Sequence, residues 1–356
     1  MPERAGPLPE YARPPRPCKP AVASVADPHR GDDRRDVSPP AGWTCRELRR
    51  YHLALISARA SPLQFHGSIC ALATPFDGDG ALDLAAFARL VDFQLTGGTQ
   101  GLVVAGSTGE AHALDAAELD LLVTQARTVV RGRVPILVGT GGANTRKTVL
   151  ATRHARSLGA DAALVVTPYY VRPTQEGLRR HFEEVADHGD LPVVLYNVPG
   201  RTGCDLLPDT VAALAQHPRI VAIKEARADE ERMRALLPLR HAGFAVLSGD
   251  DPTAARSLLA GADGVISVAN NLAPGPFRRL CDLARGGQRD AAMDLDRRLQ
   301  PLFGVLGVES NPIPVKFGLS LLGICRPGLR LPLTLLSDIH HAGLRQVIEG
   351  LKDLAA

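Results

Sequence analysis

The sequence lacks the patterns that mark disulfide-rich, metal-binding and membrane proteins. Its six cysteines include no Cys-x-x-Cys pair, and its 11 histidines include no His-x-His or His-Glu-x-x-His spacing. We therefore expect neither a disulfide framework nor a metal site. No apolar run approaches the roughly 18 residues of a membrane span, and the amino terminus lacks the apolar stretch of a secretory signal. These absences favour a cytoplasmic protein that does not insert into a membrane.

The net charge of the chain is also concentrated in its amino-terminal segment. Residues 1–62 hold 11 Lys and Arg against 7 Asp and Glu, whereas the remainder holds 30 against 31. The near-neutral remainder does not favour a nucleic-acid partner. Residues 1–62 also hold 11 of the 28 prolines, so we expect a disordered N-terminal extension or an over-extended start assignment. Within it, Trp43–Ala60 could form a short helix.

From Gly67 onward, short apolar segments bounded by Gly or Pro alternate with amphipathic ones. The apolar segments are typical of parallel strands that are buried on both faces. The expected strands are Ser68–Thr74, Gly101–Ala105, Val134–Gly139, Ala163–Thr167, Val193–Asn197, Ile220–Lys224, Ala245–Ser248 and Gly264–Val268. The expected helices are Leu82–Leu95, Ala116–Val130, Thr145–Leu158, Gln175–Ala186, Leu207–Ala215, Asp229–Leu237, Pro252–Leu259 and Pro276–Ala284.

This alternation predicts an α/β fold, a (β/α)8 TIM barrel over residues 63–290. A doubly wound open sheet is the alternative, but it usually has fewer strands, and here the first strand ends in Thr74-Pro75-Phe76-Asp77, which has no phosphate-binding character. Residues 291–356 are expected to form a C-terminal helical extension that is interrupted by Pro312 and Pro314.

Lys224 is the strongest candidate for chemistry. Barrel enzymes carry their active residues at the carboxyl ends of the strands. Of the five lysines, only Lys224 lies inside an apolar strand, so we expect no second buried lysine. Desolvation disfavours the ammonium and favours the free amine that attacks a carbonyl. A lysine neutralised by a carboxylate is the alternative, but Glu225 should face the opposite side of the strand.

Other polar residues follow neighbouring strands. Ser107 and Thr108 lie in a turn whose hydroxyl and N–H groups could hold a carboxylate or a phosphate, although an ordinary strand-to-helix loop is equally compatible. Tyr196 could direct its phenol toward the same end of the barrel or be a core tyrosine. Arg201 follows a Pro-Gly turn and is either a carboxylate clamp or a solvated loop residue.

Taken together, six segments resemble the dihydrodipicolinate synthase / N-acetylneuraminate lyase family of class I aldolases. They are Gly106–Glu110, Val166–Tyr170, Leu195–Gly203, Ile223–Ala226, Leu247–Asp251 and Asn311–Lys316. The resemblance extends from Phe65 to the C-terminus and leaves the amino-terminal segment uncovered. It implies a Schiff-base enzyme that needs no metal and no other cofactor.

The resemblance implies a role for each site residue. Lys224 would condense with pyruvate, while Tyr196, Ser107 and Tyr170 would relay protons. Tyr170 would reach in from a neighbouring subunit of a homotetramer. The residues expected to bind substrate are Thr108 for the pyruvate carboxylate, Arg201 for the carboxylate of aspartate semialdehyde, and Gly249 and Ile266 through backbone groups.

Arg201 favours the synthase branch, which condenses pyruvate with L-aspartate 4-semialdehyde in lysine (diaminopimelate) biosynthesis. Another aldolase of the family, acting on N-acetylneuraminate or a 4-hydroxy-2-oxo acid, stays the alternative. Ser107 leaves that alternative open because the synthases usually have threonine there. A phosphate-binding barrel isomerase is disfavoured by the acidic Gly249–Asp251 segment, and a non-catalytic scaffold by the retained Lys224.

One further departure concerns regulation. Relatives that are inhibited by lysine bind it with polar side chains, at positions that here carry Ala116, Leu119, Ala143 and Lys147. Only His112 and Tyr169 are compatible with that role. We therefore expect little or no inhibition by lysine.

Overall fold

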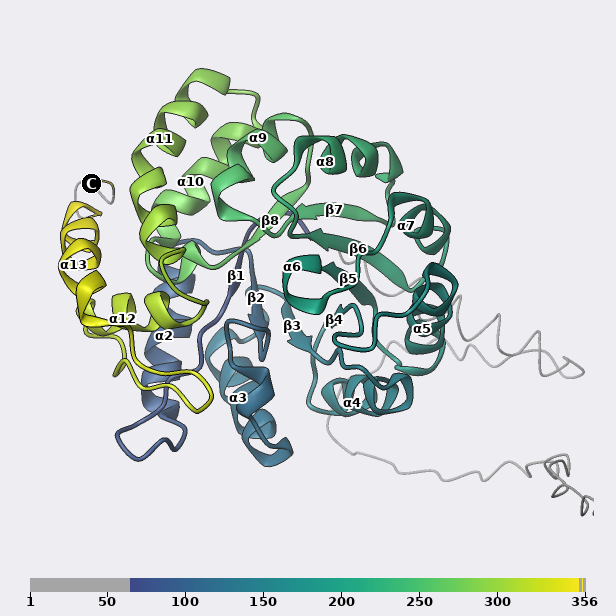
Figure 1. Cartoon of the computed structure of the whole chain (residues 1–356), viewed down its shortest axis with the longest axis horizontal. Helices are drawn as coiled ribbons and strands as arrows, with labels where there is room; N and C mark the ends of the chain where they lie inside the picture. The colour runs from purple at the N-terminus through teal and green to yellow at the C-terminus, as the bar shows by residue number, and fades with distance from the viewer. Residues whose placement is uncertain (1–64, 352–353, 355–356) are drawn as a thin grey trace, which may run out of the picture. The chain divides into compact units, whose positions relative to one another are not determined.

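A computed structural model describes residues 65–351 and residue 354, and it contains a closed ring of eight parallel strands surrounded by helices (Figure 1). The predicted TIM barrel is confirmed. The strands are β1 (Gly67–Ala71), β2 (Gly101–Val104), β3 (Ile136–Gly139), β4 (Ala162–Val166), β5 (Val193–Asn197), β6 (Ile220–Glu225), β7 (Ala245–Ser248) and β8 (Gly264–Ser267). The predictions for residues 1–62, including the helix at Trp43–Ala60, lie outside the described residues.

A helix follows each strand on the outside of the ring. These helices are α2 (Leu84–Thr96), α3 (Ala116–Val130), α4 (Thr145–Ser157), α5 (Gln175–His188), α7 (Pro208–Leu214), α8 (Glu230–Leu236), α9 (Ala254–Leu259) and α10 (Pro274–Arg285). Short 3-10 turns supplement them: η1 (Ala111–Ala113), η2 (Leu237–Leu239), η3 (Asp251–Thr253), η4 (Ala269–Asn271) and η5 (Asp338–His340). None of the described helices is long and apolar enough to cross a membrane.

Capping side chains set where several helices begin. The Asp115 carboxylate accepts from the Glu118 N–H at 2.8 Å, and the Glu118 carboxylate accepts from the Asp115 N–H. This capping box begins α3 at the residue that the sequence predicted. Asn144 caps α4 through the N–H of Lys147. The Pro-Gly turn predicted at Pro199 is instead the first turn of a short helix, α6 (Pro199–Thr202), since proline is well suited to a first helical position.

Alternation along the strands separates two apolar layers. One set of side chains fills the interior of the barrel: Ile69, Ala71, Val103, Leu137, Ala162, Leu164, Val194, Tyr196, Ala222, Leu247 and Ile266. Their neighbours, such as Cys70, Val104 and Ile223, pack against the surrounding helices. Tyr196 pairs with Lys224 across β5 and β6, and Asn197 pairs with Glu225. Tyr196 and Lys224 therefore share a face of the sheet.

The predicted C-terminal helical extension is present. It consists of α11 (Arg289–Leu306), α12 (Ile313–Leu321) and α13 (His341–Gly350), and Figure 1 shows them in the lighter green and yellow colours. Pro312 caps α12 and Pro314 lies in its first turn. Pro312 thus precedes α12 as an interruption of the extension, whereas Pro314 lies inside α12 and does not interrupt it. Phe317 and Leu344 belong to an apolar cluster that joins α12 to α13.

Candidate active site

A pocket of about 290 Å³ lies at the carboxyl ends of the strands. Six of the eight predicted site residues line it: Ser107, Thr108, Tyr196, Arg201, Lys224 and Gly249. They come from four separate stretches of the chain, which the barrel brings to one end. Tyr170 and Ile266 are not among the lining residues.

Lys224 and Tyr196 form the centre of the pocket. Lys224 is 5% exposed and Tyr196 is 7% exposed. The Lys224 Nζ lies 4.3 Å from the centroid of the Tyr196 ring, so the amine and the phenol ring are in direct contact. A side chain at Gly249 would place its Cβ 2.8 Å from the Lys224 Cε. Only glycine at position 249 leaves the lysine stem room to reach the pocket.

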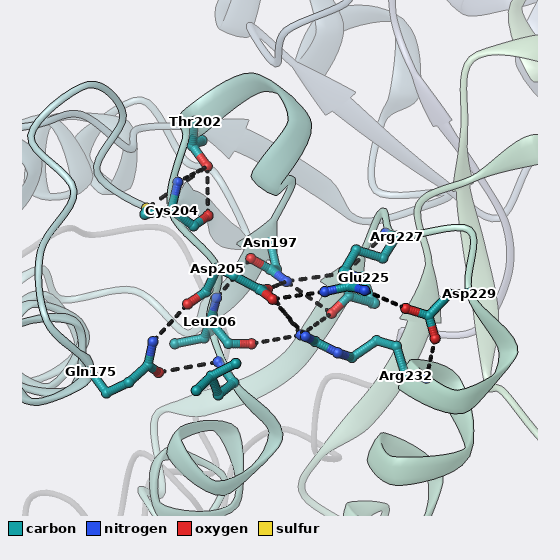
Figure 2. A network of polar contacts seen from close by, with 11 residues as sticks. Gln175, Asn197, Thr202, Cys204, Asp205, Leu206, Glu225, Arg227, Asp229 and Arg232 are labelled. Carbon is teal, nitrogen blue, oxygen red and sulfur yellow. Dashed lines mark hydrogen bonds and ion pairs between the residues drawn. The ribbon is translucent and has the colours of Figure 1, made fainter.

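Glu225 faces the outside of the barrel, as the alternation predicted, and does not pair with Lys224. The Asn197 Nδ2 donates to both Glu225 carboxylate oxygens, at 3.2 and 3.0 Å. Arg232 approaches the same carboxylate at 3.4 Å (Figure 2). Burial raises the pKa of the Glu225 carboxyl, and the bond from Asn197 opposes that shift. The backbone behind Tyr196 and Lys224 is therefore tied together by their sequence neighbours.

Asp205 extends this network toward the loops (Figure 2). Its carboxylate accepts from Arg232 at 2.6 Å, from Asn197 at 2.8 Å and from Arg227 at 2.9 Å. Burial alone would raise the pKa of Asp205, but Arg232 and Asn197 outweigh it and the pKa lies below its usual value. The carboxylate is therefore the favoured state at neutral pH, and it holds the ends of β5 and β6 in register.

Asn311 links Thr108 to Arg201; it belongs to one of the six segments that resemble the family, but no role was predicted for it. The Asn311 Nδ2 donates to the Thr108 Oγ1 at 2.9 Å. The Arg201 Nη2 donates to the backbone oxygen of Asn311 at 3.2 Å. Asn311 also lines the pocket. Its contact with Thr108 spans 203 positions in the chain, so no local pattern indicated it.

The expectation that Lys224 is the only buried lysine was wrong. Lys316 is 0% exposed. Its Nζ lies 2.6 Å from the Glu110 Oε1 and 4.2 Å from the centroid of the Phe76 ring. Burial lowers the pKa of Lys316, although Glu110 opposes that shift. Lys316 differs from Lys224 because a buried carboxylate is its direct partner.

Tyr170 and Ile266 are the two predicted site residues that do not line the pocket. Tyr170 follows β4 and is 90% exposed. Its φ is +73°, a left-handed conformation that is uncommon for residues other than glycine. Its N–H donates to the Thr202 oxygen at 3.1 Å, which fixes the loop. Ile266 is fully buried in the barrel interior, where its side chain belongs to the same apolar cluster as Tyr196.

Two acidic residues also line the pocket, Asp250 and Asp251. The Asp251 carboxylate accepts from the N–H groups of Val268 and Ala269, at 3.0 and 2.7 Å. Burial raises its pKa to about 6. Two carboxyl groups at the end of β7 do not suit a phosphate group. Within the described part of the chain, no group of three His, Cys, Asp or Glu side chains could hold a metal ion.

The closed parallel barrel and its lysine-containing pocket define an enzyme of the class I aldolase type. The profile of the dihydrodipicolinate synthetase family matches residues 64–351. The chain belongs to this family, and the family prediction is confirmed.

Individual relatives agree with this assignment. The chain is 62% identical over 279 residues to the 4-hydroxy-tetrahydrodipicolinate synthase of Xanthomonas axonopodis pv. citri, which covers 78% of this chain and 92% of that protein. A chloride-inhibited dihydrodipicolinate synthase from Acinetobacter baumannii, complexed with pyruvate, superposes with a TM-score of 0.80. It is 42% identical and covers 81% of this chain and 99% of its own. The dihydrodipicolinate synthase from Cyanidioschyzon merolae with lysine bound superposes with a TM-score of 0.78 at 34% identity. The match covers 81% of this chain and 98% of that chain.

Proposed function

We propose that the chain is a 4-hydroxy-tetrahydrodipicolinate synthase that condenses pyruvate with L-aspartate 4-semialdehyde through a Schiff base on Lys224. The observation that carries this proposal is the buried Lys224 amine, in contact with the Tyr196 ring in a pocket at the carboxyl ends of the strands. The pyruvate bound to the Acinetobacter baumannii relative supports the choice of keto acid. Trapping with borohydride and pyruvate, followed by peptide mapping, tests the proposal.

The chemistry follows from the residues in the pocket. The Lys224 amine attacks the keto carbon of pyruvate, and loss of water gives a protonated imine. This imine withdraws electrons, so the methyl carbon loses a proton and becomes an enamine nucleophile that attacks the aldehyde carbon of the second substrate. The amino group of that substrate then attacks the imine carbon, which closes the ring and releases Lys224. Each proton transfer needs a hydroxyl group nearby, and Tyr196 and Ser107 supply two of them.

The third hydroxyl of the proposed relay belongs to Tyr170 and requires a second subunit. Within one subunit Tyr170 is almost fully exposed and lies outside the pocket. Tyr169 and Val171 beside it are about half exposed, so three neighbouring side chains offer apolar surface. Burial of such a surface favours association. We propose that this loop completes the site of a neighbouring subunit in a homotetramer.

The four cysteines among the described residues are all free thiols. Free thiols are typical of proteins in a reducing compartment, which supports a location in the cytoplasm.

Arg201 is expected to choose the aldehyde. Its exposed guanidinium borders the pocket, where it can bind a carboxylate through two parallel hydrogen bonds. Arg201→Ala should raise the KM for aspartate semialdehyde about 10- to 100-fold, since a hydrogen bond to a charged group contributes about 1.5–3 kcal/mol. Borohydride trapping with pyruvate alone should stay within about two-fold of wild type.

Arg146→Ala is a matched control for Arg201→Ala, because Arg146 is exposed on α4 and does not line the pocket. It should leave both KM values unchanged. A coupled assay with each aldehyde at saturating pyruvate gives the comparison. If wild type prefers N-acetylmannosamine or another aldehyde to aspartate semialdehyde, the alternative aldolase function replaces the synthase.

Lysine is expected to inhibit this enzyme weakly or not at all. Ala116 and Leu119 on α3 offer no polar side chain, and the exposed Lys147 on α4 would repel the ammonium of a bound lysine. The loss of several charge-assisted hydrogen bonds, each about 1.5–3 kcal/mol, should weaken binding by orders of magnitude. Titration of the coupled assay with L-lysine should give less than half inhibition at millimolar concentration. Half inhibition at a lysine concentration below about 1 mM would contradict the prediction and indicate that other residues form the effector site.

A further inference from the structure

Thr108, Asn311 and Arg201 form a continuous chain of hydrogen bonds along one wall of the pocket. Thr108 follows β2, Arg201 lies in α6, and Asn311 precedes α12 of the C-terminal extension. Asn311 makes one of these bonds with its side chain and the other with its backbone. Its side-chain Nδ2 contacts Thr108 and its backbone oxygen contacts Arg201.

The direction of the first bond has a chemical consequence. Because the Thr108 Oγ1 accepts a hydrogen bond from Asn311, its own hydrogen is left to donate elsewhere. No acceptor for that hydrogen lies among the described residues, and Thr108 borders the pocket. A hydroxyl that is fixed in this way is a donor toward an anionic group, such as the carboxylate of a keto acid.

A buried ion pair holds the two segments in place. Glu110 lies two residues after Thr108, and Lys316 lies five residues after Asn311. The Glu110 Oε1 accepts from the Lys316 Nζ at 2.6 Å, and the Glu110 Oε2 accepts from the Arg330 N–H at 3.1 Å. Both members of the pair are fully buried. The loop after β2 and the start of α12 are thereby joined by two residues that do not line the pocket.

We propose that Asn311 is a positioning residue that orients the Thr108 hydroxyl toward the carboxylate of pyruvate, so that the C-terminal extension forms part of the pyruvate subsite. This inference rests on the proposed function. The effects on the two substrates can be measured separately, because the side chain of Asn311 contacts Thr108 whereas its backbone oxygen contacts Arg201. Removal of the side chain should therefore affect pyruvate and spare the aldehyde.

Four variants test this separation: Asn311→Ala, Asn311→Asp, Thr108→Val and the double variant Thr108→Val with Asn311→Ala. The pyruvate concentration for half-maximal borohydride trapping should rise about ten-fold in Asn311→Ala, as expected for one lost hydrogen bond to a charged group. The isosteric Asn311→Asp should raise it further, since a carboxylate accepts the Thr108 hydrogen and repels pyruvate. The KM for the aldehyde in Asn311→Ala should stay within about two-fold of wild type.

The double variant decides whether Asn311 acts through Thr108. If it does, the double variant should match Thr108→Val alone, because residues that share one interaction are not additive. Multiplied effects, an unchanged pyruvate requirement, or an equal rise for both substrates would overturn the proposal. If Asn311→Ala does not fold, Asn311→Asp keeps the same shape and supplies the comparison. Wild-type protein that forms no pyruvate adduct would refute the proposed function instead.

Discussion

Lys224→Ala is expected to abolish the pyruvate adduct and to lower kcat/KM by about 10³-fold or more, as the loss of a covalent nucleophile does. Wild type treated with pyruvate and borohydride should gain one adduct per chain, on the peptide that contains Lys224. The physical reason is the pocket, in which the Lys224 amine lies against Tyr196 and its stem passes over Gly249. Mass mapping of the trapped protein measures the result.

The second buried lysine makes the mapping informative. Lys316 is as inaccessible as Lys224, but its ammonium is paired with Glu110. It should therefore acquire no adduct in wild type or in Lys224→Ala. The exposed Lys147 serves as the control for nonspecific modification. An adduct that maps to Lys316 or Lys147 would contradict the assignment of Lys224.

Lys316→Met is expected to cause a large loss of stability. It leaves the Glu110 carboxylate fully buried without its cation. Breaking a buried ion pair on one side costs about 3–5 kcal/mol, because the remaining charge is uncompensated. The free energy of unfolding from a urea titration at pH 7 should fall by about that amount.

Two further variants distinguish the charge from the packing. Lys147→Met replaces an exposed lysine and should change the free energy of unfolding by about 0.5 kcal/mol or less. Lys316→Met combined with Glu110→Gln removes the unpaired charge, and the glutamine oxygen can still accept from the Arg330 N–H. The double variant should regain a substantial part of the lost stability. A Lys316→Met protein as stable as wild type would show that the pair does not stabilise the fold.

Much of the barrel was predictable because its signals are local. A strand buried on both faces needs a continuous apolar run, and a helix on the outside needs an apolar stripe. β5, β7 and α3 have the predicted bounds, and Asp115 marked the start of α3. The opposite orientation of Lys224 and Glu225 followed from the same local geometry, since successive strand residues face opposite sides.

The errors and omissions concern contacts between distant segments. Lys316 lies on an apolar helix of the extension, and nothing near it in the sequence indicates a carboxylate partner. That partner, Glu110, is 206 positions away.

The sequence by itself determined the alternation of strands and helices, and with it the barrel and the placing of Lys224 in an apolar strand. Only the tertiary structure decided that Asn311 contacts Thr108, that Lys316 is buried against Glu110, and that Tyr170 is almost fully exposed outside the pocket. The physical reason is the range of the interactions. Propensity and periodicity act over a few residues, whereas a hydrogen bond or ion pair depends on how the closed barrel brings remote loops together.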